Sequence, residues 1–423
     1  MPVITIFRGT FCEGDPVVQS VLKETGYRPV RDQDIVSEAS RASNLGDAKA
    51  SRAFSARTSV FNKFTHEKER SIAHLRLALA ELLSRDNLLI DGFVSHLVPR
   101  EVSHALRVCL IADMKFRVSL AVKEQGFSEK EAVKVIHKQD EDRLSWVYNL
   151  FQKNNPWDPS LYDIVIPMNK KTVQEAAGLI VQNIASDAVK MTQASRQAVQ
   201  DFLLAARVEV VLAGEGHHVG VSSKKGLITL IINKHVLMLG RLEEELKSIA
   251  GGVEGVKSVE TRVGSGFYQA DVYRKFDFEL PSKVLLVDDE REFVQTLSER
   301  LLMRDMGSAV AYDGESALSM IAEDEPEVMI LDLKMPGIDG IEVLRRVKES
   351  RPEIEVIILT GHGSEADRET CMNLGAFAYL QKPVDIEVLS ETLKQANQKV
   401  QHAKDRRKRK DLDLSARAIG PQE

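Results

Sequence analysis

Four pieces of sequence decide the fold of residues 283–400: Val287-Asp288-Asp289-Glu290, Ile330-Leu331-Asp332-Leu333-Lys334, Leu359-Thr360-Gly361 and Gln381-Lys382-Pro383. Each piece ends a short apolar run, and each run is followed by a pattern typical of an amphipathic helix. This repeated strand-then-helix order predicts a parallel sheet with helices on both faces. Loops at the carboxyl ends of such strands converge on one crevice, so we expect five side chains to meet there. They are Asp288, Asp289, Asp332, Thr360 and Lys382.

A cluster of three carboxylates suits a divalent metal ion and a phosphoryl group. The like charges raise one another's pKa unless a cation neutralises them, and oxygen ligands with room for water suit Mg²⁺. Lys382 would add a positive charge beside them. A carboxylate in this place can attack phosphorus and form an acyl phosphate, and the Thr360 hydroxyl could then donate to a phosphoryl oxygen. Each piece alone is typical of an ordinary surface turn, so only their order and combination indicate this chemistry.

Residues 283–400 carry these motifs in the order of a two-component receiver domain, and they resemble that family over the whole stretch. The resemblance implies a flavodoxin-like (βα)5 fold. It also implies that Asp332 accepts the phosphoryl group, and that Asp288, Asp289, Asp332 and the backbone carbonyl of Lys334 hold Mg²⁺. The phosphodonor that it implies is a histidine kinase or a phosphotransfer protein.

The same resemblance implies how a signal leaves the site. Thr360 matches the family's switch hydroxyl, Tyr379 its switch aromatic residue, and Lys382 the lysine that contacts the phosphate. The Lys382–Pro383 bond is often cis in the family, a geometry that costs little energy only at X-Pro bonds. We therefore expect phosphorylation to change the surface built from residues 364–400, and to alter self-association or docking through it.

The composition is typical of a soluble, cytoplasmic protein. The chain has 423 residues, 43% of them hydrophobic and 28% charged, a length typical of roughly two to four domains. No apolar run approaches the roughly 18 residues that span a bilayer, so no transmembrane segment is expected. Cys12, Cys109 and Cys371 lack metal-binding spacing and are expected to be reduced thiols. The net charge of −6 argues against general nucleic-acid binding.

The N-terminal end has a strand, a glycine-containing loop and a helix in the order of a phosphate-binding loop. Val3–Phe7 is predicted to be the strand, and the loop runs from Gly9 to Gly14. Glycines there would let backbone N–H groups cradle a phosphate. However, Asp15 and Pro16 stand where such a loop needs a lysine and a hydroxyl residue. The Asp15 carboxylate would repel a triphosphate, so we favour a plain strand–turn–helix.

Residues 1–184 predict an α/β layer fold and resemble the cytidylate-kinase-like family of P-loop proteins. Strands are predicted at 87–91, 106–111 and 162–166, and helices at 128–137, with a capping box from Ser128 to Glu131, and at 173–184. The matching stretches are Leu110–Arg117, Gly126–Ala132, Asp140–Arg143 and Tyr162–Ile166. The resemblance implies that Arg117 and Arg143 lie near nucleotide phosphates, above a loop bounded by Gly9 and Gly14.

The departures from that family fall at the phosphate end. Phe11-Cys12-Glu13 and Asp91-Gly92-Phe93 stand where the family has small or Gly-Arg-Gly sequences. We therefore expect a degenerate kinase fold that senses a ligand, with a nucleotide as one candidate. The alternative is an active nucleoside-monophosphate kinase of the cytidylate type, gated by the receiver. A third interpretation is a scaffold whose N-terminal domains only bind partners.

The middle of the chain predicts a small α+β module. A helix at 194–207, a hairpin of strands at 219–223 and 227–232, a helix at 236–249 and a strand at 255–263 give the order α-β-β-α-β. With the phrase Val253–Val259, this order resembles a BON domain, a module often credited with binding membranes or ligands. His217 and His218 are expected to lie in a solvated turn without a metal, because adjacent strand residues point to opposite faces.

The sequence thus predicts four parts: a kinase-like domain at 1–185, a BON-like domain at 186–278, a receiver at 279–401 and a basic, flexible tail at 402–423. The linker into the receiver is expected at 268–281. No DNA-binding fold follows the basic run Lys404–Lys410, so nucleic acid is not an expected partner. The leading interpretation is a cytoplasmic phosphorelay response regulator that is phosphorylated on Asp332 and regulates its N-terminal module.

Overall fold

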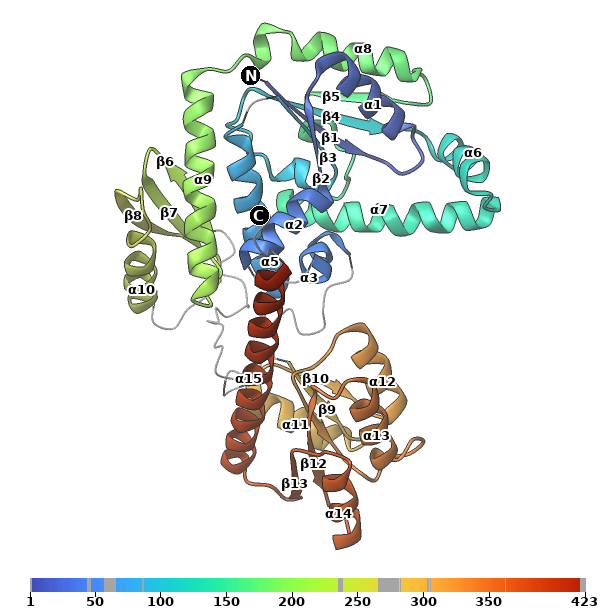
Figure 1. The fold of residues 1–423 in the computed structure, drawn as a ribbon, viewed down its shortest axis with the longest axis vertical. Coiled ribbons are helices and arrows are strands. Elements are labelled where there is room, and N and C mark those ends of the chain that lie inside the picture. Colours follow the sequence, from blue (N-terminus) through green and yellow to red (C-terminus); the bar gives the residue numbers. More distant parts are fainter. Residues whose placement is uncertain are drawn as a thin grey trace. The chain divides into compact units, whose positions relative to one another are not determined.

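The computed structural model describes residues 2–43, 47–56, 66–85, 87–234, 239–264, 281, 283–302, 304, 306–361 and 363–418. Contacts divide the chain into two units, one of Met1–Thr58 with Glu67–Tyr273 and the other of Ser59–His66 with Arg274–Glu423. Figure 1 labels the elements of both units. No helix within the described ranges is both long and apolar enough to cross a membrane. The predicted linker at 268–281 lies outside the described residues, apart from Pro281.

The first unit contains a parallel sheet whose described strands follow the order β2-β3-β1-β4-β5. They are β1 (Val3–Arg8), β2 (Arg28–Arg31), β3 (Leu88–Asp91), β4 (Ala105–Ile111) and β5 (Ile164–Pro167). The helices are α1 (Gly14–Thr25), α2 (Asp32–Ser43), α3 (Asp47–Ser51), α5 (Glu67–Leu83), α6 (Met114–Gln125), α7 (Glu129–Phe151) and α8 (Val173–Ile184). Short 3-10 helices are η1 (Arg52–Phe54), η2 (Phe93–Leu97), η3 (Pro159–Leu161) and η4 (Asp187–Val189). The parallel α/β class is confirmed, whereas β2 was not predicted.

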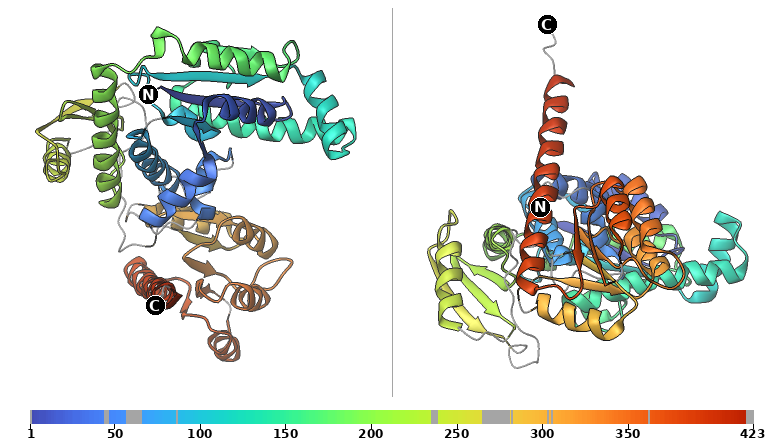
Figure 2. Two further views of the ribbon diagram at one scale, coloured as in Figure 1. Left: turned by 45° about the horizontal axis from the view of Figure 1, so that its top comes forward. Right: turned by 90° about the horizontal axis from the view of Figure 1, so that it is seen from below.

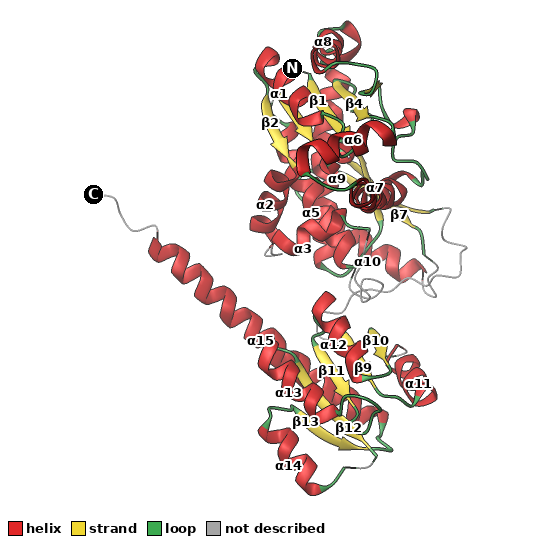
Figure 3. Cartoon of the chain, turned by 90° about the vertical axis from the view of Figure 1, so that its right-hand side faces the viewer, coloured by secondary structure: helices red, strands yellow, loops and turns green. Residues whose placement is uncertain are grey.

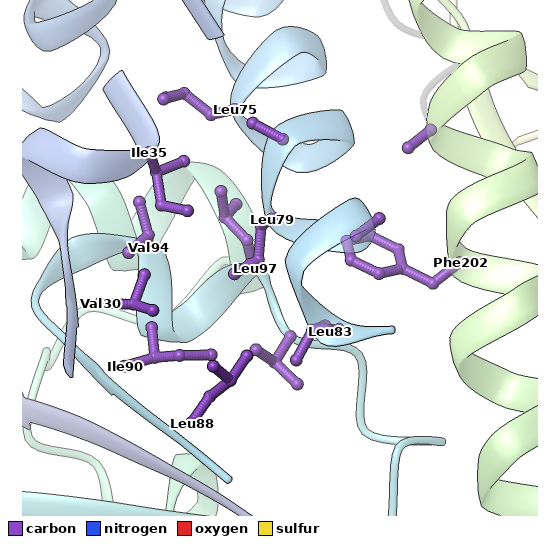
Figure 4. Close-up of a cluster of buried hydrophobic side chains, with 14 of the residues drawn as sticks. Val30, Ile35, Leu75, Leu79, Leu83, Leu88, Ile90, Val94, Leu97 and Phe202 are labelled. Carbon is purple, nitrogen blue, oxygen red and sulfur yellow. The ribbon is translucent and has the colours of Figure 1, made fainter. Parts of the chain in front are cut away.

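This sheet is buried on both faces because successive side chains of a strand point to opposite sides. In β1, Val3 and Phe7 enter one core, while Ile4 and Ile6 enter the other. Figure 4 shows part of the first core, where Phe202 reaches toward the side chains of α5. Nearly continuous apolar runs such as Val3–Phe7, interrupted only by Thr5, are what two covered faces require.

Helix α7 is longer than predicted. Its capping box of Ser128 and Glu131 is present as expected, but the helix continues to Phe151 instead of ending near His137. The polar run Asp140–Arg143 therefore lies inside a helix, where Asp140 and Arg143 contact Arg117 and the end of β1. The buried residues Ile136, Trp146 and Val147 hold the helix against the domain.

The middle module has the predicted α-β-β-α-β order. Its elements are α9 (Gln193–Gly214), β6 (Gly220–Lys224), β7 (Leu227–Ile232), α10 (Leu239–Gly251) and β8 (Ser258–Val263). Strand β7 pairs antiparallel with β6 and parallel with β8. The first three residues predicted for the second helix, 236–238, lie outside the described residues.

Helix α9 joins this module to the kinase-like sheet. Figures 1 and 2 show α9 running beside α5, and Arg76 of α5 lies 3.2 Å from the Glu209 carboxylate of α9. Burial raises the pKa of Glu209, which the positive charge of Arg76 opposes. The middle module is therefore packed on its N-terminal neighbour inside one unit.

The second unit has a parallel sheet whose described strands follow the order β10-β9-β11-β12-β13, as in a flavodoxin-like fold. The strands are β9 (Val284–Val287), β10 (Ser308–Ala311), β11 (Val328–Leu331), β12 (Glu355–Thr360) and β13 (Ala378–Gln381). The helices are α11 (Arg291–Leu302), α12 (Gly314–Glu323), α13 (Gly340–Ser350), α14 (Glu365–Asn373) and α15 (Ile386–Ala418). Two buried clusters cover the two faces of the sheet, which lies among the helices in Figure 3. The predicted fold is confirmed, although β10 was not predicted.

Helix α15 differs from the predicted end of the receiver. Leu389, Leu393 and Ala396 bury one side of it against the sheet, and Lys399 pairs with the buried Glu355 at 2.9 Å. The helix then continues past residue 401 to Ala418, so the segment predicted as a flexible tail begins as helix.

Candidate functional site

The second sheet brings the predicted site residues together. Strands β9, β11 and β12 are paired in register, with Leu331 opposite both Val287 and Ile358. The next residues after β9 and β11 are Asp288 and Asp332, which therefore emerge side by side. Sequence reasoning predicted this arrangement correctly because parallel strands expose their carboxyl ends at one edge.

The three carboxylates form a compact cluster. Ligand oxygens of Asp288, Asp289 and Asp332 lie within 4.8 Å of one another, a donor set of carboxylate oxygens that fits Mg²⁺. Asp288 and Asp332 are buried, whereas Asp289 is exposed. Burial raises the pKa of Asp288, although the hydrogen bond from Lys382 opposes the rise. These are the residues that would hold the metal ion.

Lys382 supplies the positive charge that the cluster needs. Its Nζ lies 2.6 Å from Asp288 Oδ2, 3.0 Å from Glu290 Oε1 and 3.7 Å from Asp332 Oδ2. Burial works to lower the pKa of Lys382, but its hydrogen bonds to Asp288 and Glu290 outweigh this effect and the pKa is raised. The ammonium group also lies 4.4 Å from the centre of the Phe293 ring. The contact with Glu290 was not predicted, although that residue directly follows the acidic pair.

The loop after Asp332 is held close to the cluster. Asp332 Oδ1 accepts a hydrogen bond of 2.7 Å from the backbone N–H of Leu333. A Cβ atom placed on Gly340 would overlap the Asp332 carbonyl oxygen, so only glycine allows α13 to start here. Lys334 lies in this loop with an exposed side chain, and the role of its carbonyl as a metal ligand stays a prediction. The Lys382–Pro383 bond is cis, as expected.

The two residues predicted to act as a switch, Thr360 and Tyr379, both lie against Gly363. Thr360 is buried at the end of β12, and the hydroxyl of Tyr379 is buried without a hydrogen-bond partner among the described residues. A Cβ atom on Gly363 would overlap Tyr379 Oη and lie 3.0 Å from Thr360 Cγ2. The Tyr379 hydroxyl is therefore already buried beside Gly363 in this structure. Gly363, which leaves room for it, was not recognised from the sequence.

An arginine with two carboxylate partners lies against the glycine loop of the first unit. Arg8, the last residue of β1, makes two hydrogen bonds of 2.9 Å to Asp91 and one of 2.8 Å to Asp15. A Cβ atom on Gly14 would lie 2.5 Å from Arg8 Cδ, so the arginine lies directly against the loop. Burial alone would lower the pKa of Arg8. The nearby carboxylates of Asp15 and Asp91 outweigh this effect, so the pKa of Arg8 is raised.

The two arginines implied by the kinase resemblance do face this loop, but both are engaged. Arg117 makes two hydrogen bonds of 2.8 Å to Asp140 and a third, also 2.8 Å, to the Thr10 carbonyl. Arg143 donates to the Arg8 carbonyl at 2.8 Å and to a carbonyl of its own helix. The cations that a kinase would direct at phosphate are therefore bonded to protein oxygens.

The loop itself is strained and acidic. Phe11 and Glu13 adopt φ of 54°, a left-handed conformation that usually requires glycine. Gly9 and Gly14 line a cavity of about 480 Å³ beside the loop. The charged residues among its described lining are three arginines and five acids: Arg8, Arg31, Arg143, Glu13, Asp15, Asp32, Asp91 and Glu124. Burial raises the pKa of Cys12 in the loop to about 11, so it remains a thiol at neutral pH.

The histidine pair of the middle module differs in part from the prediction. His217 is buried within 3.4 Å of Glu245 rather than solvated, and His218 is exposed. Among the described residues, the three receiver carboxylates are the one group that could hold a metal ion.

Comparison with known families assigns both ends of the chain. The response regulator receiver domain matches residues 284–394, and the cytidylate kinase-like family matches residues 3–170. The chain therefore has a receiver domain at its C-terminal end and a region of the cytidylate kinase-like family at its N-terminal end. The BON-like character of residues 186–278 stays a prediction.

Similar proteins share the receiver. "Response regulator MprA" of Mycolicibacterium vanbaalenii is 34% identical over 110 residues, 26% of this chain and 48% of that protein. The MprA of Mycobacterium avium is 36% identical over 107 residues, 25% of this chain and 47% of that protein. The chain thus spans about half the length of these relatives. A receiver domain structure from Clostridium thermocellum is 33% identical, with a TM-score of 0.28, covering 29% of this chain and 98% of that one.

Proposed function

We propose that this protein is a phosphorelay response regulator in the cytoplasm that accepts a phosphoryl group on Asp332 and regulates a kinase-like module. The observation that carries the proposal is the cluster of three carboxylates within 4.8 Å, next to the Lys382 ammonium. The phosphodonor is a histidine kinase or a phosphotransfer protein, as for receiver domains in general.

In the proposed reaction, a carboxylate oxygen of Asp332 attacks the phosphorus of a phosphohistidine. A new P–O bond forms, the P–N bond breaks, and the imidazole nitrogen leaves with the electron pair. Lys382, already 3.7 Å from Asp332 Oδ2, lies where it would pair with a phosphoryl oxygen, and the Thr360 hydroxyl would donate to another. Mg²⁺ held by Asp288, Asp289 and Asp332 would neutralise charge on the transferred group.

The direct test uses acetyl phosphate and Mg²⁺ with the full chain. We expect one phosphoryl group per chain, stable in acid and labile in base, and no labelling of Asp332→Asn because an amide is a poor nucleophile. Glu349→Gln is the matched control, because it makes the same acid-to-amide change on the exposed side of α13. Full labelling of Asp332→Asn would refute the assignment.

The proposed module does not transfer phosphate itself. Arg8, Arg117 and Arg143 are bonded to protein oxygens, and Asp15 faces the loop where a kinase carries a lysine. Several kcal/mol of transition-state stabilisation would be missing without these contacts, on the order of the contribution of such charge clamps. We expect no transfer from ATP to CMP above the background of an Arg143→Ala variant. Turnover of about one per second that this variant abolishes would show that the alternative, a gated kinase, is correct.

We propose that the signal leaves through residues 364–400. Because the Tyr379 hydroxyl is already buried, phosphorylation would stabilise this position rather than create it. Hydrogen exchange with and without beryllofluoride should show slower exchange in this stretch. If the site is occupied and exchange there is unchanged, the proposed route is wrong. Self-association through this surface is tested in the same samples by sedimentation.

A further inference from the structure

A second cavity lies on the other side of Phe7 from the glycine loop. It has a volume of about 210 Å³ and lies between the β1–β4 side of the first sheet and the C-terminal end of α7. Thr5 and Arg107 line it from the sheet, and Leu150 lines it from α7. Phe7 is the one described residue that lines both this cavity and the loop cavity. It is therefore a separate site, and neither the receiver chemistry nor the glycine loop uses it.

Four uncharged aromatic side chains form part of the wall of this cavity, Phe7, His96, Phe151 and Tyr162. The His96 ring lies 4.2 Å from the ring of Phe7, 5.5 Å from that of Phe151 and 5.6 Å from that of Tyr162, measured between centroids. Burial lowers the pKa of His96 to about 3, so the imidazole carries no charge at neutral pH. The rings offer flat surfaces against which another aromatic ring can pack in an offset or edge-on geometry.

The described charged residues that line the cavity are all positive. Arg76, Arg100 and Arg107 line it, and none of the described residues in its lining is acidic. The loop cavity on the other side of Phe7 differs, because acids outnumber arginines in its lining. A ligand that enters the second cavity is therefore selected for negative charge.

Arg107 is the most buried of these cations, whereas the side chain of Arg76 is 28% exposed and Arg100 is exposed. Its side chain is 14% exposed, and its nearest carboxylate, Asp163, is 3.9 Å away. Its guanidinium instead donates to the carbonyls of Ala105 at 3.1 Å and Pro99 at 2.6 Å. By contrast, Arg117 lies 2.8 Å from both oxygens of one carboxylate. A buried guanidinium that lacks a close carboxylate gains from an anion supplied by a ligand.

The volume limits the size of that anion. An apolar cavity of about 150 Å³ is enough to hold benzene, so one of about 210 Å³ holds a single ring with a short side arm. We propose that this cavity binds a small aromatic carboxylate, with its ring against Phe7, His96 and Phe151 and its carboxylate directed at Arg107. The kinase-like module is then a sensor of such an acid.

The site is also placed to affect the middle module. Arg76, which lines the cavity, pairs with Glu209 of α9 at 3.2 Å and lies 5.5 Å from the centre of the Phe202 ring. A carboxylate in the cavity attracts Arg76 in competition with Glu209. Occupancy therefore alters the contact that holds α9 to α5.

The test is calorimetric titration of the full chain with phenylacetate, compared with its neutral isostere phenylacetamide. We expect phenylacetate to bind at least tenfold more tightly than the amide. Arg107→Gln should remove that preference, because the glutamine can still donate a hydrogen bond but carries no charge. Equal binding of acid and amide to the native chain, or no binding of phenylacetate at about 10 mM, overturns the proposal.

A second pair of variants tests where phenylacetate binds while leaving the arginines unchanged. Leu150→Trp fills the cavity from α7 and should weaken phenylacetate binding at least tenfold. Tyr148→Trp is the matched control, because this residue lies on the same helix, is 46% exposed and does not line the cavity. We expect it to bind as the native chain does. Unchanged binding by Leu150→Trp would place phenylacetate elsewhere and refute the site.

Discussion

Replacing Asp32 by asparagine should change how the stability of the first unit depends on pH. The Asp32 carboxylate accepts hydrogen bonds from the backbone N–H groups of Phe93, at 3.0 Å, and Val94, at 2.9 Å. Burial nevertheless raises its pKa from 3.8 to about 6. Since one pKa unit corresponds to about 1.4 kcal/mol, ionising Asp32 in the folded protein costs about 3 kcal/mol more than in the unfolded chain.

The sign of the effect follows from the raised pKa. Below about pH 4 the carboxyl is protonated in both states and this cost is absent. As the pH rises from about 4 through 6, the unfolded chain loses the proton first, so stability from this group is lost. The asparagine side chain of the variant cannot ionise. The free energy of unfolding of Asp32→Asn, relative to the native chain, should therefore rise by up to about 3 kcal/mol between pH 4 and pH 7.

The assay is urea unfolding followed by tryptophan fluorescence. The two tryptophans, Trp146 and Trp157, both lie in the first unit, so the receiver does not contribute to the signal. Asparagine has one acceptor oxygen where aspartate has two, and this loss is a constant offset that cancels between pH values. Glu38→Gln, exposed on the same helix, is the control. A difference between Asp32→Asn and the native chain that is flat or falls with pH would refute the reasoning.

Three further substitutions test other contacts. Tyr379→Phe should leave receiver stability unchanged or raise it by about 1 kcal/mol in calorimetric unfolding, because the buried hydroxyl has no hydrogen-bond partner among the described residues. A clear loss of stability would show that the hydroxyl has a partner. Gly363→Ala should still be labelled by acetyl phosphate. It should lose the protection from hydrogen exchange that beryllofluoride induces, because the alanine Cβ would overlap Tyr379 Oη, and retained protection would contradict this prediction. Arg117→Met should destabilise the first unit by about 3 kcal/mol in urea unfolding, because it leaves the Asp140 carboxylate unpaired. The double variant Arg117→Met, Asp140→Asn should lose much less stability, and losses that simply add would exclude this coupling.

The strands that the sequence did not predict are both at sheet edges. β2 (Arg28–Arg31) and β10 (Ser308–Ala311) lie at the ends of their strand orders, where one side of the strand has no neighbour among the described strands. Central strands of a parallel sheet need nearly continuous apolar runs, and such runs are a clear strand signal in the sequence. An edge strand needs fewer buried side chains. Arg-Pro-Val-Arg and Ser-Ala-Val-Ala therefore lack the apolar run from which the other strands were predicted.

The two candidate sites differ in how much the sequence could foretell. In the receiver, Asp288, Asp332 and Lys382 each directly follow a strand, so strand prediction alone placed them at one edge of the sheet. In the kinase-like loop, the sequence showed that Asp15 replaces a lysine. It could not show that Arg8 lies against the loop, because that depends on Asp91, which is 83 residues away in the chain. Pairing of this kind is decided by packing and leaves no local pattern.

Helix α9 has a consequence for the order in which the protein folds during synthesis. Phe202 and Ala206 complete the core beside α5, whereas Val208 and Leu212, further along the same helix, belong to the core of the middle module. The ribosome releases the N-terminal segment first, but the core of that segment stays incomplete until α9 has emerged. The kinase-like domain is therefore expected to finish folding only while the middle module is being synthesised. Helix α9 completes the core of the first domain and begins the core of the second.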